Sequence, residues 1–218
     1  MTNFKDIKIE SPALHLVSGM PGGGKTVTCF SIGDKIHERT KKEMYVEVTE
    51  GQVGIPDKLP KWIHGWRGAD YPLDSIVLSD DTQLNRHARS FGTNLNVEFD
   101  KLLSTQRHDR IDYILDSQTM KAIDVNNVLR SHYRWYKKPY DLDVKLGRPE
   151  VKKELEAAAS MDLKKTEAYL VAETFDYSFE GKVTDIPLPK YWSDELSVMH
   201  RRRDPTTYEQ IKTRLRIY

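Results

Sequence analysis

The sequence predicts an α/β fold, with a mostly parallel sheet flanked by helices and a small C-terminal elaboration. Three observations support this prediction. Short apolar runs alternate with helix-like segments over the first 140 residues, as in successive β-α-β units. A glycine-rich stretch separates the first expected strand from the first expected helix. After Pro139 the pattern changes to one charged, alanine-rich segment and two β-like runs.

The expected elements follow the apolar pattern along the chain. Apolar or alternating runs predict strands at 13–19, 43–48, 75–78 and 112–115. Helical spacing predicts helices at 25–41, 99–106 and 122–133. The glycines and prolines of residues 50–72 predict a loop-rich connection. Beyond residue 140 we expect a helix at 149–165, β-like runs at 168–175 and 177–186, and a basic helical end at 206–217.

Length and composition indicate one large domain. The chain has 218 residues, enough to bury about 70% of its unfolded surface. We expect a core at 1–140 and an extension at 141–218 packed on the same domain. Charged residues make up 31% and hydrophobic residues 38%, which argues against a mainly disordered chain and a polytopic membrane protein. The formal net charge is +1. Bulk charge predicts no polyanionic partner, so any nucleic-acid contact must come from local clusters.

The cysteine and histidine content restricts disulfides and metal sites, and the first residues indicate the expected location. The single cysteine, Cys29, lies in an apolar stretch and excludes an internal disulfide or a cysteine metal cage, so we expect a buried thiol. The seven histidines show no zinc-binding spacing. The first residues carry charges where a signal peptide would be apolar, so a cytoplasmic location is expected.

The strongest motif is a phosphate-binding loop. Residues 19–26 match the pattern GxxxxGK[ST] between an expected strand and an expected helix, which is the context that the motif requires. Backbone amides of such a loop surround phosphate oxygens at a helix N-terminus. Lys25 is expected to reach the β- and γ-phosphates, and Thr26 to bind Mg²⁺. The expected nucleotide-binding residues are Gly19, Pro21, Gly22, Gly23, Gly24, Lys25, Thr26 and Val27.

An acidic pair follows the strand at 75–78. In P-loop proteins an aspartate at such a strand end holds Mg²⁺, which makes Asp80 the candidate metal ligand. Asp81, one residue later, is the candidate general base that polarises the attacking water. Many ATPases have glutamate there, whose side chain is one methylene longer. The alternative is a solvated turn in which the pair caps a helix.

A basic and polar block follows between residues 105 and 118. Gln118, at the tip of an expected strand, can contact the γ-phosphate or the attacking water. Arg107 or Arg110 can serve as an arginine finger toward a neighbouring subunit. The alternatives are a loop-capping amide for Gln118 and surface charges for the two arginines.

In their order, these motifs resemble the zonula-occludens-toxin-like family, which includes filamentous-phage assembly ATPases and belongs to the FtsK/HerA group. That group also contains DNA-translocating and viral genome-packaging ATPases. The resemblance covers about residues 13–135. Its motifs are Gly19–Thr26, Asp80-Asp81 with Thr82-Gln83, Arg107-His108, Ser117-Gln118, Ile123-Asp124 and Val128-Leu129-Arg130.

The resemblance implies a RecA-like or FtsK/HerA-like P-loop NTPase that hydrolyses ATP with Mg²⁺. It assigns Lys25, Asp81, Gln118, Arg107 and Arg110 to catalysis. It further implies a homo-oligomeric ring, a hexamer or pentamer, that translocates or packages double- or single-stranded DNA, together with a capsid or membrane vertex partner. The host cytoplasm or a virion is the expected location.

Two departures from the family pattern and two alternative functions remain open. The acidic pair is Asp-Asp rather than Asp-Glu, and the chain lacks the transmembrane helix with which the assembly ATPases usually continue. One alternative function is an assembly factor that drives virion extrusion at a membrane without gripping DNA. Another is a P-loop kinase for a small molecule.

Two further segments combine basic and aromatic residues. The basic stretch 200–216 can track a DNA backbone or remain a solvated end. The segment 133–140 interleaves aromatic residues with Arg134, Lys137 and Lys138. It can bind single strands, or its aromatic side chains can pack in the core at a sheet edge.

Overall fold

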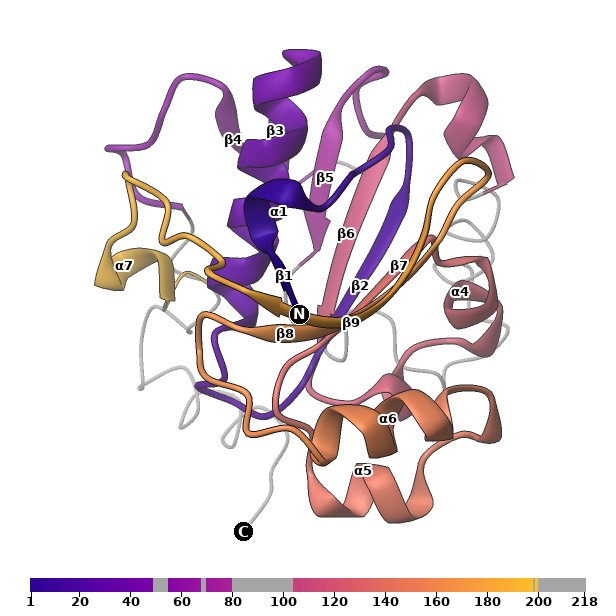
Figure 1. Cartoon of the computed structure of the whole chain (residues 1–218). Coiled ribbons are helices and arrows are strands. Elements are labelled where there is room, and N and C mark those ends of the chain that lie inside the picture. Colours follow the sequence, from indigo (N-terminus) through magenta and orange to yellow (C-terminus); the bar gives the residue numbers. More distant parts are fainter. Residues whose placement is uncertain (49–54, 68–69, 80–103, 198, 200–218) are drawn as a thin grey trace, which may run out of the picture.

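The computed structural model describes residues 1–48, 55–67, 70–79, 104–197 and 199. Within these residues one nine-stranded sheet forms the centre of the fold (Figure 1), in the order β1-β9-β8-β7-β2-β6-β5-β3-β4. The strands are β1 (Thr2–Asn3), β2 (Leu14–Ser18), β3 (Met44–Glu47), β4 (Ile63–Trp66), β5 (Ile76–Ser79), β6 (Asp112–Ser117), β7 (Tyr133–Tyr136), β8 (Ala168–Glu173) and β9 (Ser178–Thr184). The predicted mostly parallel sheet is therefore confirmed.

Strands β2 to β7 are parallel, so their carboxyl ends lie at one edge of the sheet. Only β8 runs the other way, pairing antiparallel with both β7 and β9 among the described strands. The two strands after residue 140 therefore hydrogen bond into the same sheet as the earlier ones. The division at residue 140 remains a proposal.

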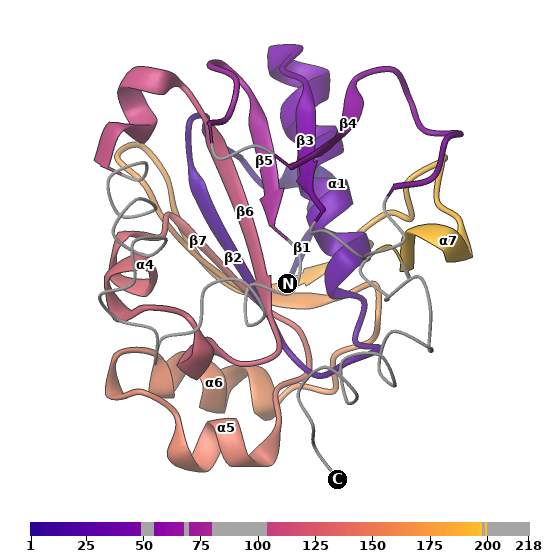
Figure 2. The same cartoon turned by 180° about the vertical axis from the view of Figure 1, so that it is seen from behind.

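Helices cover both faces of the sheet (Figures 1 and 2). The labelled helices are α1 (Lys25–Thr40), α4 (Val125–Arg130), α5 (Asp141–Leu146), α6 (Lys152–Ala159) and α7 (Asp194–Ser197), and residues 104–109 are also helical. Short 3-10 turns lie at Phe4–Asp6, Met120–Ala122 and Pro149–Val151. α1 packs against β2, β5 and β6, and α6 packs against β8.

The core is divided between the two faces by the strand alternation. In β2, Leu14 and Leu16 face the core with α4 and α6, whereas Val17 faces the core with α1. On the α1 side, Cys29 is fully buried, which confirms the expected buried thiol. Burial of central strands on both faces is typical of parallel sheets.

The segment 50–72, expected to be a loop-rich connection, contains strand β4. This part of the prediction was wrong because β4 is short and lies at the sheet edge, where it pairs with β3 from Met44 to Glu47. Gly65 within β4 leaves room for Ile55, whose Cγ1 would lie 3.3 Å from a Cβ at that position. Tertiary pairing overrides the local glycine signal here.

The helix expected at 122–133 is limited to α4. The Ser131 N–H and hydroxyl both bond to the Val128 carbonyl, which ends the helix, and β7 begins at Tyr133. β7 is an interior strand between β2 and β8, and its Tyr133, Trp135 and Tyr136 are fully buried. The core interpretation of these aromatic side chains is confirmed, although the strand is not at a sheet edge.

Other boundaries also differ from the prediction. The helix expected at 149–165 spans only the 3-10 turn and α6, because the chain turns after Ser160, where the Met161 N–H bonds to the Ala158 carbonyl three residues back. β6 continues two residues beyond the predicted end, through pairing with β2. The expected helix at 99–106 is described only from residue 104 onward, where the chain is helical as far as residue 109. Residues 99–103 lie outside the described residues. The basic end 200–218 also lies outside them.

Candidate nucleotide-binding site

The predicted phosphate loop connects β2 to α1 at the carboxyl edge of the sheet. Two of its glycines, Gly22 and Gly24, adopt left-handed backbone conformations with φ of 72° and 87°. L-residues with a Cβ rarely adopt this region, so the conformation explains glycine at both positions. Pro21 is exposed, whereas Thr26 and Val27 are half-buried in the first turn of α1.

Backbone hydrogen bonds hold the loop in place. The Met20 N–H donates to the Lys138 carbonyl at 2.9 Å, and the Gly23 N–H donates to the Met20 carbonyl at 3.1 Å. The half-buried Lys25 places its ammonium 3.5 Å from the Met20 carbonyl oxygen. The ammonium is therefore held at the loop, where a bound phosphate would replace this long hydrogen bond.

The N-terminus of α1 adds to the anion-binding character of the loop. The N-cap residue is Gly24, which has no side chain to satisfy the amides of the first turn. These amides and the helix dipole favour a bound anion. Sixteen residues of α1 follow, so the dipole belongs to a full-length helix. The N-terminus of α1 therefore favours a bound anion at this loop.

Strand β6 brings Gln118 to the same edge. β6 lies between β2 and β5, and its last residue, Ser117, is opposite Ser18, the last residue of β2. Gln118 is half-buried and follows β6 directly, just as Gly19 begins the phosphate loop after β2. The fold thus brings together the first residue of the loop and the predicted sensor residue. Asp80 and Asp81, predicted to follow β5, lie outside the described residues.

The two candidate arginines lie at the amino edge of the parallel strands, opposite the edge that carries the phosphate loop. Arg107 is exposed in the helix at 104–109, and Arg110 is exposed just before the amino end of β6. Arg110 pairs with Asp74, 3.2 Å away. Six residues of β6 separate this edge from Gln118, which corresponds to about 20 Å along the strand. Neither arginine can reach the phosphate loop of its own chain, so a catalytic role requires a neighbouring copy.

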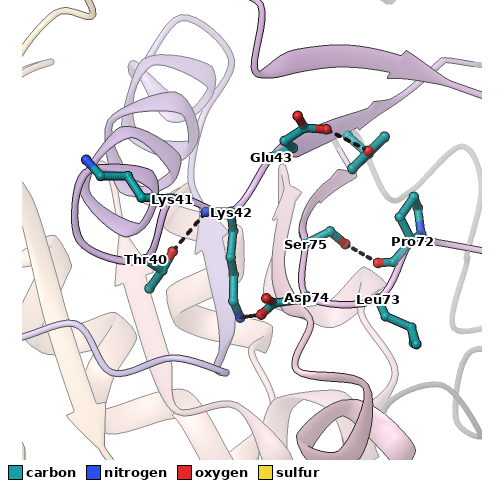
Figure 3. Close-up of a pocket in the computed structure, with 9 residues that line it drawn as sticks. Thr40, Lys41, Lys42, Glu43, Pro72, Leu73, Asp74 and Ser75 are labelled. Carbon is teal, nitrogen blue, oxygen red and sulfur yellow. Dashed lines mark hydrogen bonds and ion pairs between the residues drawn. The ribbon is translucent and has the colours of Figure 1, made fainter.

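A pocket of about 260 Å³ also opens at this opposite edge, away from the phosphate loop (Figure 3). Its polar groups bind one another: Lys42 lies 3.7 Å from Asp74, and the Ser75 hydroxyl donates to the Pro72 carbonyl at 2.6 Å. The pocket is lined by Thr40, Lys41, Lys42, Glu43, Tyr45, Pro72, Leu73, Asp74 and Ser75. We assign it no part in nucleotide binding.

The structure reveals residues around the loop that the sequence motifs did not identify. Lys137 is buried directly after β7, and burial lowers the pKa of its amine to about 8. Its ammonium donates to the Lys165 carbonyl at 2.7 Å. Sequence analysis placed Lys137 in an aromatic-plus-basic segment. The available signal in the sequence was the position of this lysine directly after a run of aromatic residues expected to be buried, which indicates a structural role.

Gly24 allows a sharp test of the loop geometry. A Cβ at Gly24 would lie 2.7 Å from the Lys165 carbonyl oxygen, whereas a Cβ at Gly22 would meet nothing within 4 Å. Both positions have a positive φ, so alanine costs about 1–2 kcal/mol of backbone strain at either one. We expect Gly24→Ala to weaken binding of ATPγS at least about tenfold more than Gly22→Ala does. Titration calorimetry measures both, and equal losses would contradict the described packing.

Across the described ranges, no group of three or more His, Cys, Asp and Glu side chains is arranged to hold a metal ion. Thr26 does lie beside the phosphate loop in the first turn of α1, where a hydroxyl fits a phosphate-bound cation. In the same part of the chain, no helix is both long and apolar enough to cross a membrane.

Comparison with known proteins finds similarity in structure only. No family model matches the sequence, and no curated protein matches it. Among solved structures, the genome packaging NTPase B204 of Sulfolobus turreted icosahedral virus 2, in complex with AMPPCP, aligns with a TM-score of 0.61 at 9% identity. The alignment covers 80% of this chain and 100% of B204.

Two further structures resemble the chain. ATPases 2 and 3 of EssC from Geobacillus thermodenitrificans align with a TM-score of 0.53 at 11% identity, over 95% of this chain and 45% of that one. The N-terminal domain of zonular occludens toxin from Neisseria meningitidis aligns with a TM-score of 0.45 at 18% identity, over 88% and 100%. The chain thus has the fold of P-loop ATPases such as B204 and EssC, as the sequence predicted.

Proposed function

We propose that this chain is a P-loop ATPase of the FtsK/HerA group that uses Mg²⁺-dependent ATP hydrolysis to translocate or package DNA. The observation that carries the proposal is the conformation of the loop between β2 and α1. Left-handed glycines Gly22 and Gly24 open the backbone at the N-terminus of α1, and Lys25 and Thr26 follow at once. This combination binds nucleotide phosphates. The similarity of the fold to the genome packaging NTPase B204 supports the choice of ATPase class.

The proposed site residues have separate roles in phosphate binding, Mg²⁺ binding and activation of the attacking water. The amides of Gly24 to Thr26 and the ammonium of Lys25 bind the β- and γ-phosphates, which offsets the charge that develops on phosphoryl transfer. Mg²⁺, held by Thr26 and Asp80, would neutralise further phosphate charge. Asp81 orients and polarises the attacking water. Gln118 responds to the γ-phosphate from the end of β6, beside the strand that leads into the loop.

We further propose that the active form is a homo-oligomeric ring, a pentamer or hexamer. Arg107 and Arg110 are too far from the phosphate loop of their own chain to stabilise its transition state. In a ring, one of them can reach the site of the adjacent copy as an arginine finger. DNA would pass along the ring, which would dock on a capsid or membrane vertex. The host cytoplasm or the virion is the proposed location.

The proposal predicts ATP turnover that rises with DNA. We expect steady-state hydrolysis to increase several-fold when double-stranded DNA is added at about 50 mM salt, and the increase to shrink at about 200 mM, because DNA contacts release counterions. Single-stranded DNA in a parallel titration identifies the preferred polymer.

Each other outcome selects a different function. Turnover that requires Lys25 but ignores DNA under both salt conditions would contradict DNA translocation and favour an assembly factor. Transfer of the γ-phosphoryl group to a small acceptor, without DNA, would favour a kinase. Oligomer size, measured by light scattering with ATPγS present, tests the ring, and a monomer at every concentration would contradict it.

A further inference from the structure

Lys137 lies beside the phosphate loop because β7 pairs with β2. Its N–H donates to the Ser18 carbonyl at 2.7 Å, which extends the β2–β7 ladder past the last strand residue, Tyr136. The next residue, Lys138, accepts a hydrogen bond from the Met20 N–H. Residues 137 and 138 therefore accompany the chain as it leaves β2 and enters the loop.

The Lys137 side chain runs along the protein side of the loop. A Cβ added at Gly19 would lie 2.7 Å from the Cβ of Lys137, and a Cβ added at Gly23 would lie 3.6 Å from it. At its far end, the ammonium donates to the Lys165 carbonyl oxygen at 2.7 Å, and that oxygen lies 2.7 Å from the position of a Cβ at Gly24. One side chain thus connects the beginning of the loop with its end.

Lys137 is also a buried cation, and among the described residues no carboxylate forms an ion pair with it. Its side chain is 1% exposed. Within the part of the chain that the structure describes, the titratable groups that act on it are the Cys29 thiol of α1 and the Glu167 carboxylate before β8. Glu167 is itself engaged by the Lys182 ammonium at 2.8 Å and by the Lys164 N–H at 2.9 Å. Because burial disfavours the ammonium form, an anion bound in the loop would stabilise the charge on Lys137.

We infer that Lys137 is a positioning residue of the nucleotide site, pinning the Lys165 peptide against Gly24 and adding positive charge behind the bound phosphates. The inference rests on the proposed function, since it requires nucleotide in this loop. It identifies a second lysine besides Lys25 that selects a highly charged ligand. It also links nucleotide binding to the segment 160–167, which connects α6 to β8.

The charge on Lys137 makes a measurable prediction for proton uptake. The lowered pKa of about 8 means that the amine is partly neutral at pH 8, and bound phosphate favours its charged form. We expect the wild type to take up as much as about half a proton on binding ATPγS at pH 8. Calorimetry in two buffers of different ionisation enthalpy measures this uptake.

Lys137→Met tests whether the charge on Lys137 supports nucleotide binding. Methionine keeps most of the side-chain volume but removes the positive charge and the hydrogen-bond donor. We expect ATPγS affinity to fall about tenfold at pH 7, and the proton uptake at pH 8 to be lost. Lys153→Met, at an exposed position of α6, removes the same net charge and is expected to match the wild type in both measurements. Cys29→Ala removes the neighbouring thiol and should retain the proton uptake.

The outcomes separate this inference from the proposed function. A wild type that does not bind ATPγS contradicts both. A wild type whose binding depends on Lys25 but takes up no proton at pH 8 contradicts the inference alone, without reference to any Lys137 variant. Unchanged affinity and proton uptake in a folded Lys137→Met variant likewise overturn it and leave the proposed ATPase intact.

Discussion

Replacing Lys25 with alanine is expected to lower kcat for ATP hydrolysis by about 10²–10³, the loss seen when one donor to a developing anion is removed. Lys25 is the first residue of α1, and its ammonium already lies at the loop, 3.5 Å from the Met20 carbonyl. The truncated side chain cannot follow the charge that moves onto the transferred phosphoryl oxygens. Steady-state phosphate release measures the change.

Fold integrity decides how that result is interpreted. Lys25 is half-buried and bonds only weakly to its own loop, so the melting temperature of Lys25→Ala should stay within about 2 °C of the wild type. Lys145→Ala, at an exposed position of α5, serves as the matched control and should retain full turnover. Hydrolysis by Lys25→Ala at the wild-type rate would show that turnover comes from another site or from a contaminant.

Replacing Lys42 with alanine is expected to destabilise the fold by about 3–5 kcal/mol, the cost of removing one partner of a buried ion pair. The Lys42 ammonium donates to Asp112 Oδ2 at 2.8 Å and to the Ser11 hydroxyl at 3.0 Å, and it also bonds to the Arg110 carbonyl. Asp112 is fully buried at the start of β6. For a chain of this size, the melting temperature should fall by about 10 °C.

The pH dependence of that loss identifies its cause. Burial already raises the pKa of Asp112, and removing Lys42 raises it further. A raised carboxyl pKa disfavours the folded state only where the group ionises, so the deficit of Lys42→Ala should shrink as pH falls toward 4. Lys41→Ala, at the exposed neighbouring position, is the control and should change little. A deficit independent of pH would assign the loss to packing instead.

The Lys42 cluster lies at the sheet edge opposite the phosphate loop, around the pocket in Figure 3. We therefore expect the folded fraction of Lys42→Ala to keep the wild-type KM for ATP. The two substitutions should thus separate function from stability. Lys25→Ala should lose turnover with its fold intact, whereas Lys42→Ala should lose stability while its nucleotide site remains competent.

The phosphate loop and the fold class were predictable from the sequence because their signals are local. Residues 19–26 combine glycines, a lysine and a threonine between an apolar run and a helical segment, and all of these lie within about 30 residues. The left-handed conformations of Gly22 and Gly24 match what that pattern requires. Local periodicity likewise located β2, α1, β3, β5 and the β8–β9 pair.

The arrangement around the loop depended on strand order, which local periodicity does not specify. Insertion of β6 between β2 and β5 places Gln118 beside the loop, and pairing of β7 with β2 places Lys137 behind it. The same order sends Arg107 and Arg110 to the far edge. The edge strand β4 formed in a segment whose local signals favoured a loop, and β7 lies in the sheet interior although its aromatic pattern favoured a sheet edge.

The sequence by itself therefore determined that a phosphate-binding loop joins a buried strand to a helix in an α/β protein. Only the tertiary structure decided which distant residues support that loop and which face away from it. The physical reason is that loop conformation follows from the backbone preferences of neighbouring residues. Strand order, in contrast, follows from burying both faces of the whole sheet at once, which involves residues more than 100 positions apart, such as Ser18 and Tyr136.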